Sequence, residues 1–219
     1  SMGFSNYDPR ALVTPDISGL SNPEAMRAAY DAGVRFVVSD TSRPGMDNPT
    51  PQTGIPNWNE PGILMIPRRP VNLFYNVTTP SEWTAEYNYL YRSYWGRDLT
   101  YSEILDKVSD VVLQYALRGE IDPWMFHQSN LRAYDGVHTL LGDFLDRTLQ
   151  KYSNLFLLPV NSPTQVSLGE SMLQRMSYNS SGVRASFIPD QKTITLSTTR
   201  PVVVPVTGLC TSSSEVYGG

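Results

Sequence analysis

Apolar residues fall into two kinds of segment, and the two kinds alternate over most of the chain. Short apolar runs of strand length are separated by longer stretches with apolar residues at helical spacing. The predicted strands are residues 11–13, 35–38, 63–67, 73–77, 124–126 and 156–160. The predicted helices follow Asn22, run over 80–91 and 101–119, begin near Val137 and cover 166–176. Alternating strands and helices predict the α/β class, in which neighbouring strands run parallel.

The pattern changes after Tyr178, where short β-rich segments follow one another without helices. These segments cover residues 183–187, 193–197 and 201–206, with turn residues between them. We therefore expect an α/β region over residues 5–178 and a β-rich tail or module over 179–219. Residues 1–4, which open with Ser-Met-Gly, resemble a linker or cloning scar.

Charge and cysteine content restrict the classes of partner and site. The chain has 17 basic and 21 acidic side chains, a net charge of -4, and no run of Lys or Arg, which disfavours nucleic acid as a partner. Its single cysteine, Cys210, excludes an internal disulfide and a zinc site built of several thiolates. No apolar segment approaches the roughly 20 residues of a transmembrane helix.

Composition favours a secreted or cell-surface protein. Thirteen tyrosines, four tryptophans and seventeen prolines accompany only 17% charged residues. The tripeptides that begin at Asn76 and Asn179 match the N-glycosylation pattern.

The best candidate for chemistry is His127, which follows the predicted strand Trp124–Phe126 and begins a polar cluster. The carboxyl ends of strands carry the functional groups of many α/β enzymes, and an imidazole can exchange a proton near neutral pH. The alternative is a hydrogen-bonded histidine without a chemical role. His138 is the other histidine and fits a surface position, so the two histidines make no recognisable metal pair.

Asp16 and Asp40 each follow a predicted strand, and both could face His127. A carboxylate beside an imidazole raises the pKa of the imidazole, as a general acid needs. Aspartates at such positions also cap helices and turns, which is the competing interpretation. Trp124 is placed to stack on a ligand, although tryptophans more often pack in a core.

The segments around residues 12–19, Asp40 and Met125-Phe126-His127 resemble three successive motifs of the NodB-like polysaccharide deacetylases. The sequences of residues 124–132 and 175–183 are similar to those of the fungal galactosaminogalactan deacetylases and their bacterial relatives. The resemblance implies part of a deformed (β/α) barrel. It also implies metal-dependent N-deacetylation of an acetylated amino-sugar exopolysaccharide, with release of acetate.

The resemblance also implies the roles of individual residues. His127 becomes the general acid and Asp40 the carboxylate that tunes it. Asp16, Ser18 and Arg43 become substrate contacts, together with Trp124. The family's divalent metal is usually zinc, held by an aspartate and two histidines of the first two motifs.

This sequence departs from the family pattern in two ways. Thr14 stands where the third motif has an arginine, so Arg43 or Arg10 would have to replace it. The first two motifs are absent, so this chain alone does not fully ligate a metal. We therefore expect a carboxyl-terminal part of a longer enzyme that is inactive without its N-terminal part, and Cys210 fits that interpretation.

Two other functions stay open at this stage. The first is a non-catalytic carbohydrate-binding or assembly module that uses the aromatic residues. The second is a glycoside hydrolase with Asp16 and Asp40 as its paired carboxylates, which would have to lie roughly 5 to 10 Å apart.

Overall fold

A computed structural model of the chain describes residues 7–46, 48 and 50–206. Cys210 and the predicted linker at residues 1–4 lie outside the described residues. The chain forms two compact units. Unit 1 comprises Ser1–Ser39, Asn48–Pro67 and Leu158–Gly219, and unit 2 comprises Asp40–Asp47 and Arg68–Leu157. Each unit is described by itself.

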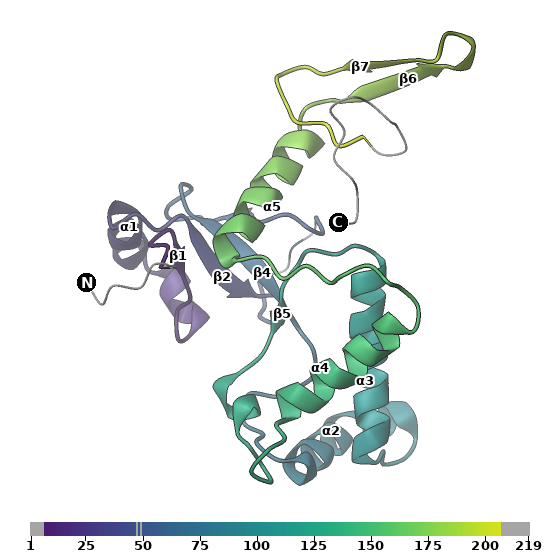
Figure 1. Cartoon of the computed structure of the whole chain (residues 1–219). Helices are drawn as coiled ribbons and strands as arrows, with labels where there is room; N and C mark the ends of the chain where they lie inside the picture. Colours follow the sequence, from purple (N-terminus) through teal and green to yellow (C-terminus); the bar gives the residue numbers. More distant parts are fainter. Residues whose placement is uncertain (1–6, 47, 49, 207–219) are drawn as a thin grey trace. The chain divides into compact units, whose positions relative to one another are not determined.

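The strands form one mixed sheet and one separate hairpin (Figure 1). They are β1 (Ala11–Leu12), β2 (Phe36–Asp40), β3 (Ile55–Pro56), β4 (Leu64–Pro70), β5 (Trp124–Met125), β6 (Arg184–Ile188) and β7 (Thr193–Ser197). In the sheet, β1 pairs with β2 and β5 with β4 in parallel, whereas β3 pairs with β4 antiparallel. The parallel pairs confirm the α/β prediction, because strand and helix alternate along the chain.

Each of the five α-helices begins behind a residue whose side chain accepts a backbone N–H of the first turn. They are α1 (Pro23–Asp31), α2 (Pro80–Trp95), α3 (Tyr101–Leu117), α4 (Leu140–Ser153) and α5 (Gln165–Asn179). Asn22 caps α1, and a threonine caps each of the others. Such caps satisfy N–H groups that have no partner inside the helix, which explains why the helices start where the sequence predicts.

In unit 1, α5 packs closely against β2. Gly169 of α5 faces Phe36 of β2, and a Cβ atom at position 169 would lie 2.2 Å from Cδ1 of that ring. Gln165 donates from Nε2 to the carbonyl of Phe36 at 3.2 Å. The absence of a side chain at Gly169 therefore allows the close approach of helix and strand.

The core of unit 2 lies among α2, α3, α4 and the loop that precedes α2. Figure 1 shows these three helices gathered together. Its fully buried side chains include Trp83, Ile104, Val112, Leu140 and Phe144. The apolar residues that recur at helical spacing in the sequence thus form the core of this unit.

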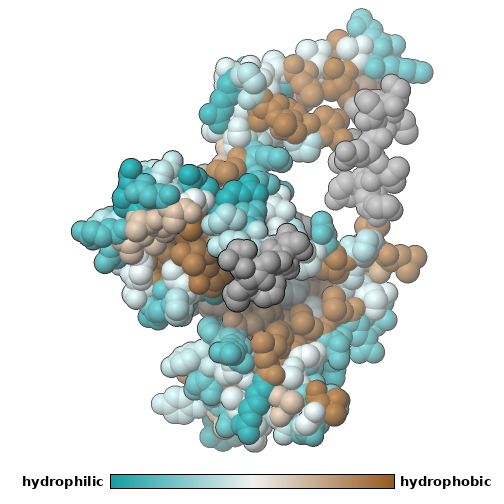
Figure 2. All heavy atoms as spheres, turned by 60° about the vertical axis from the view of Figure 1, so that its left-hand side comes forward, coloured by the Kyte–Doolittle hydropathy of each residue, from teal (hydrophilic) through white to brown (hydrophobic). Residues whose placement is uncertain are grey.

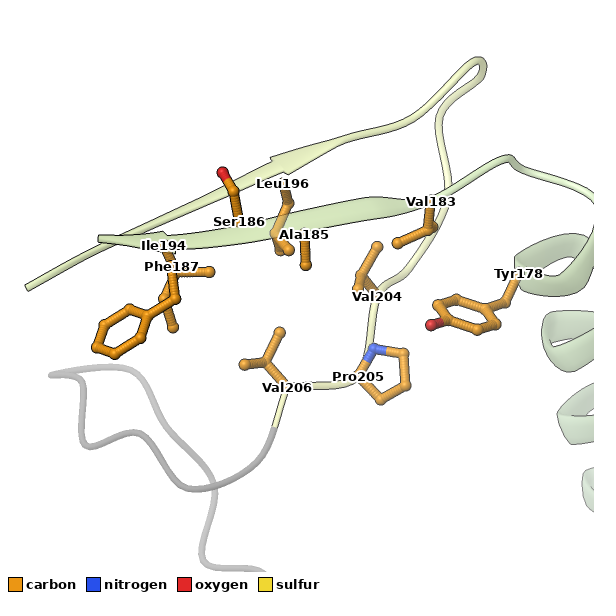
Figure 3. A pocket seen from close by; sticks show the side chains of 10 residues that line it. All are labelled: Tyr178, Val183, Ala185, Ser186, Phe187, Ile194, Leu196, Val204, Pro205 and Val206. Atoms are coloured by element: carbon orange, nitrogen blue, oxygen red, sulfur yellow. The ribbon is translucent and has the colours of Figure 1, made fainter. Parts of the chain in front are cut away.

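The β6–β7 hairpin of unit 1 has one apolar face. Phe187 pairs with Ile194, and Ala185 pairs with Leu196, so all four side chains point the same way. Figure 2 shows hydrophobic residues gathered over this hairpin. Val204 and Val206 lie under the same face, and together these residues line a hollow of about 350 Å³ (Figure 3).

Four details of the predicted secondary structure were wrong. Residues 73–77 form no strand, because side chains rather than a neighbouring strand take their carbonyl groups. Residues 156–160 form none either, since the Phe156 N–H bonds the Tyr152 carbonyl at the end of α4. Residues 201–206 are irregular, and residues 44–61, for which the sequence predicts no strand, contain β3.

The described residues thus form a mixed α/β fold with a separate small antiparallel sheet. Closure into a deformed (β/α) barrel stays a prediction, as do the domain boundaries at residues 5–178 and 179–219. No helix in the described part of the chain has the length and apolar character needed to cross a membrane.

We expect Gly169→Ala to lower the free energy of unfolding by about 1 to 3 kcal/mol, because the new methyl group must displace a buried ring. Urea unfolding followed by circular dichroism measures this loss. The control is Gly19→Ala, where nothing lies within 4 Å of the added Cβ. Equal stability of the two variants would contradict the packing argument.

Candidate functional site

His127 is half-buried at the end of β5 and begins a short 3-10 helix, Gln128–Leu131. Its backbone is extended, with φ -125° and ψ 155°, and the chain changes direction where the 3-10 helix follows. The strand that leads to it is held by an ionic contact. Arg69 of β4 lies 3.0 Å from a carboxylate oxygen of Glu120 and 3.2 Å from one of Asp122, just before β5. The sequence correctly predicts a histidine at the end of a strand.

The side chain of Asn130 joins the His127 turn to the loop of residues 71–78. Its Oδ1 accepts the His127 N–H at 3.0 Å, and its Nδ2 donates to the carbonyls of Phe74 at 2.9 Å and Val77 at 3.2 Å. Asn130 is fully buried. An amide is suited to this position because it offers one acceptor and two donor hydrogens to three backbone groups.

Asp40 and Arg68 bring opposite charges to the surroundings of His127. Asp40 ends β2, and Arg68 lies in β4. The N–H and hydroxyl of Thr41 both donate to the Arg68 carbonyl, at 3.2 and 3.0 Å, which fixes the two strands side by side. Unit 2 therefore places a carboxylate, a guanidinium and an imidazole in one electrostatic environment.

The pKa of His127 is lowered from its ordinary value of 6.5. Burial is the main cause, and the positive charge of Arg68 adds to it, whereas the negative charge of Asp40 acts in the opposite direction. Burial also lowers the pKa of Arg68, against a favourable interaction with Asp40. The effect of Asp40 on the imidazole has the predicted direction, but burial and Arg68 outweigh it.

Two of the other predicted residues belong to the same unit. The side chain of Asp40 accepts from the N–H and hydroxyl of Ser42, at 2.9 and 2.6 Å. These bonds shape the turn that carries Arg43, whose N–H donates to the Asp40 carbonyl at 3.1 Å. Trp124 is half-buried and meets Phe144 of the core edge-on, with ring centroids 6.5 Å apart. This packing accounts for Trp124 without a ligand, so its contact with substrate stays a prediction.

Asp16 and Ser18 lie in unit 1, where they form a local cap. Asp16 Oδ1 accepts the Ser18 N–H at 2.8 Å at the start of the 3-10 helix Ile17–Ser21. This is the capping role that the sequence left open for Asp16. The participation of Asp16 and Ser18 in substrate binding stays a prediction.

Sequence reasoning missed three residues of the site. Arg68 directly follows the apolar run of residues 63–67, so it resembled an ordinary charged residue at a strand end, and Asn130 resembled any polar loop residue. Tyr75 was assigned to a strand, but its ring meets the ring of His127 edge-on, with centroids 6.0 Å apart and planes at 67°. The only signal was the polar run Gln128-Ser129-Asn130 directly after the histidine.

The site has no grouping suited to a resident metal ion. Within residues 7–46, 48 and 50–206, no three His, Cys, Asp or Glu side chains come together as metal ligands. The described residues that surround His127 therefore do not form a metal centre by themselves. The hollow under the β6–β7 hairpin is lined mainly by aliphatic side chains and offers little chemistry.

Comparisons with known proteins identify relatives of this chain. A sequence profile described as the Agd3 deacetylase domain matches residues 2–186. The chain is also similar to the crystal structure of Agd3, described as a novel carbohydrate deacetylase, with a TM-score of 0.73 and 23% sequence identity. That match covers 88% of this chain and 31% of the solved one, so this chain spans under a third of its length. A search of curated proteins finds no match.

We expect the two histidines to titrate in a defined order. Asp135 lies 2.7 Å from His138 Nδ1 and raises the pKa of His138, whereas the pKa of His127 is lowered. On acidification His138 therefore protonates first. Proton NMR of the two imidazoles follows this directly, with His138→Gln for assignment.

The same spectra test the two charges. Arg68→Met should raise the pKa of His127, because it removes a positive charge, and Asp40→Asn should lower it further. Shifts in the same direction for both variants would contradict this arrangement of charges.

We expect Asn130→Ala to lower the free energy of unfolding by about 2 to 4 kcal/mol, because it leaves three buried backbone groups without a partner. The freed turn should also expose His127 and move its pKa back toward the ordinary value. The control is Asn57→Ala in unit 1. Asn57 is equally buried and donates to the Leu20 carbonyl at 2.9 Å. A comparable stability loss there should leave the His127 titration unchanged.

Proposed function

Because this chain belongs to the Agd3 deacetylase domain family, we propose that it supplies the proton-donating part of a carbohydrate N-deacetylase site. The substrate of this proposal is an acetylated amino-sugar exopolysaccharide, and the products are acetate and a free amine. The observation that carries the proposal is His127 at a strand end with Asp40 and Arg68 in its electrostatic surroundings.

His127 acts as the general acid when the amide bond of the substrate breaks. Water contributes a hydroxyl group to the acetyl carbon, the C–N bond breaks, and the departing nitrogen takes a proton from the imidazolium. An unprotonated amine anion is a very poor leaving group, so this proton transfer lowers the barrier. The proton released by the water returns the imidazole to its protonated form, and the acetic acid that is formed gives its proton to the amine, so the products are acetate and an ammonium group.

Asp40 and Arg68 have opposite effects on the stability of the protonated imidazole. The Asp40 carboxylate stabilises the imidazolium, which keeps a protonated fraction available. Arg68 and burial destabilise the imidazolium, which makes it a stronger acid once it is formed. A proton donor that is stronger than an ordinary histidine suits protonation of a nitrogen that gains basicity only as the bond breaks.

The proposal includes a divalent metal, with zinc as the expected ion. A metal ion of this kind lowers the pKa of a bound water. Among the described residues no three His, Cys, Asp or Glu side chains come together. The proposal therefore assigns the ligands of the metal to another part of the deacetylase. We therefore expect no acetate release from the 219-residue chain alone. A secreted or cell-surface location is part of the same proposal, because the substrate is an extracellular polymer.

The predicted substrate contacts fall into two groups. Arg43 stands on the Asp40 turn and Trp124 at the start of β5, both in unit 2 with His127. Asp16 caps the 3-10 helix Ile17–Ser21 of unit 1, and Ser18 lies in that helix. We assign all four to the binding of the polymer rather than to proton transfer.

We expect His127→Ala to reduce acetate release from N-acetylated amino-sugar polymer by about 10²- to 10⁴-fold in the complete enzyme, the usual contribution of a general acid. Metal content, measured by elemental mass spectrometry, should stay unchanged. Acetate is measured with a coupled enzymatic assay.

The control is His138→Ala, which removes the other histidine at an exposed position 2.7 Å from Asp135. It should retain full activity. A fully active His127→Ala enzyme would exclude the general-acid role, and equal losses in both variants would point to a general effect of histidine removal.

A further inference from the structure

Tyr75 exposes 72% of its surface at the tip of a loop that is otherwise anchored in the core. Three residues of the same loop, Val71, Leu73 and Val77, are almost completely buried, at 4%, 3% and 2% exposure. Buried and exposed positions thus alternate along a segment without strand pairing. The buried apolar residues anchor the loop in the core, whereas the aromatic ring of Tyr75 is left in solvent.

The backbone of this loop is held independently of the Tyr75 ring. The Ser129 hydroxyl donates to the Tyr75 carbonyl at 2.5 Å, and Asn130 donates to the carbonyls of Phe74 and Val77. Arg132 Nη1 donates to the Thr78 hydroxyl at 3.0 Å. Every one of these bonds comes from the turn that begins at His127, so the position of Tyr75 is fixed relative to the candidate general acid.

The ring itself lies beside the imidazole. The centroids of the Tyr75 and His127 rings are 6.0 Å apart and the ring planes meet at 67°, so the edge of one ring faces the other ring. At 72% exposure, most of the surface of Tyr75 is open to solvent despite this contact. Other strongly exposed tyrosines of unit 2, such as Tyr89 and Tyr94, stand on helix α2.

A flat aromatic face in a fixed position complements the apolar C–H face of a pyranose ring. Tyrosine combines that face with a hydroxyl that can remain in water, and it loses little side-chain entropy on binding. From this geometry we propose that Tyr75 stacks on a sugar ring of an N-acetylated hexosamine polymer and holds it beside His127. The inference rests on the proposed function, since it assigns a sugar-binding residue to the same site.

The test measures binding apart from catalysis. An N-acetylglucosamine tetramer and an N-acetylgalactosamine tetramer are each titrated into the 219-residue chain. Isothermal calorimetry gives the Kd, and NMR follows the His127 imidazole. At least one tetramer should bind and shift the His127 signal. Absence of binding by either tetramer overturns the inference.

Substitutions then separate the aromatic face from other properties of the residue. Tyr75→Ala and Tyr75→Leu should weaken binding about tenfold, because both remove the face, whereas Tyr75→Phe should stay within about twofold. Tyr89→Ala, with an 87% exposed tyrosine on α2, is the matched control and should change nothing. Unchanged affinity in Tyr75→Ala, or full affinity in Tyr75→Leu, overturns the stacking role.

Acetate release from the complete enzyme reports on the proposed function separately. Weakened tetramer binding in Tyr75→Ala supports the stacking role even if no acetate is released by any variant. Conversely, acetate release that depends on His127 but has the same KM in Tyr75→Ala retains the proposed function and overturns the role of Tyr75.

Discussion

The candidate site depends on one buried amide. Asn130 bonds the backbone of the His127 turn and two carbonyls of the neighbouring loop, so a single side chain joins two segments that are more than 50 residues apart in sequence. Neither segment has strand pairing of its own at that point. Without this amide, their backbone groups would be buried or partly buried without these partners, which would lower the stability of the folded unit.

Around this joint, the electrostatics of His127 result from three opposing effects. Burial removes the water that would stabilise an imidazolium, Arg68 adds repulsion, and Asp40 adds attraction. Burial is the largest of the three, followed by Arg68 and then Asp40. A proton donor set in this way is adjustable, because a small movement of either charged side chain changes its acidity in a known direction.

The elements were predictable where local chemistry decides, and the site was predictable only in part. Asn22 and the four capping threonines precede helices that the sequence predicts, and β5 lies just before the histidine that follows the predicted strand. Arg68 was missed because its importance depends on which strands become neighbours, a non-local fact. Asn130 and Tyr75 were missed because Tyr75 and the carbonyl partners of Asn130 belong to a loop that resembled a strand. For residues 156–160, apolar composition predicted a strand, but a strand requires a pairing neighbour that composition does not reveal.

In the loop that carries Tyr75, the stability of the backbone does not depend on which side chain stands at position 75. Its anchors are buried valines and a leucine, and its polar bonds run through carbonyl groups, which every amino acid possesses. Replacement of the exposed residue therefore leaves the scaffold intact. In evolutionary terms, position 75 is a site at which selection can exchange one residue for another and alter ligand preference without first having to compensate for lost folding stability.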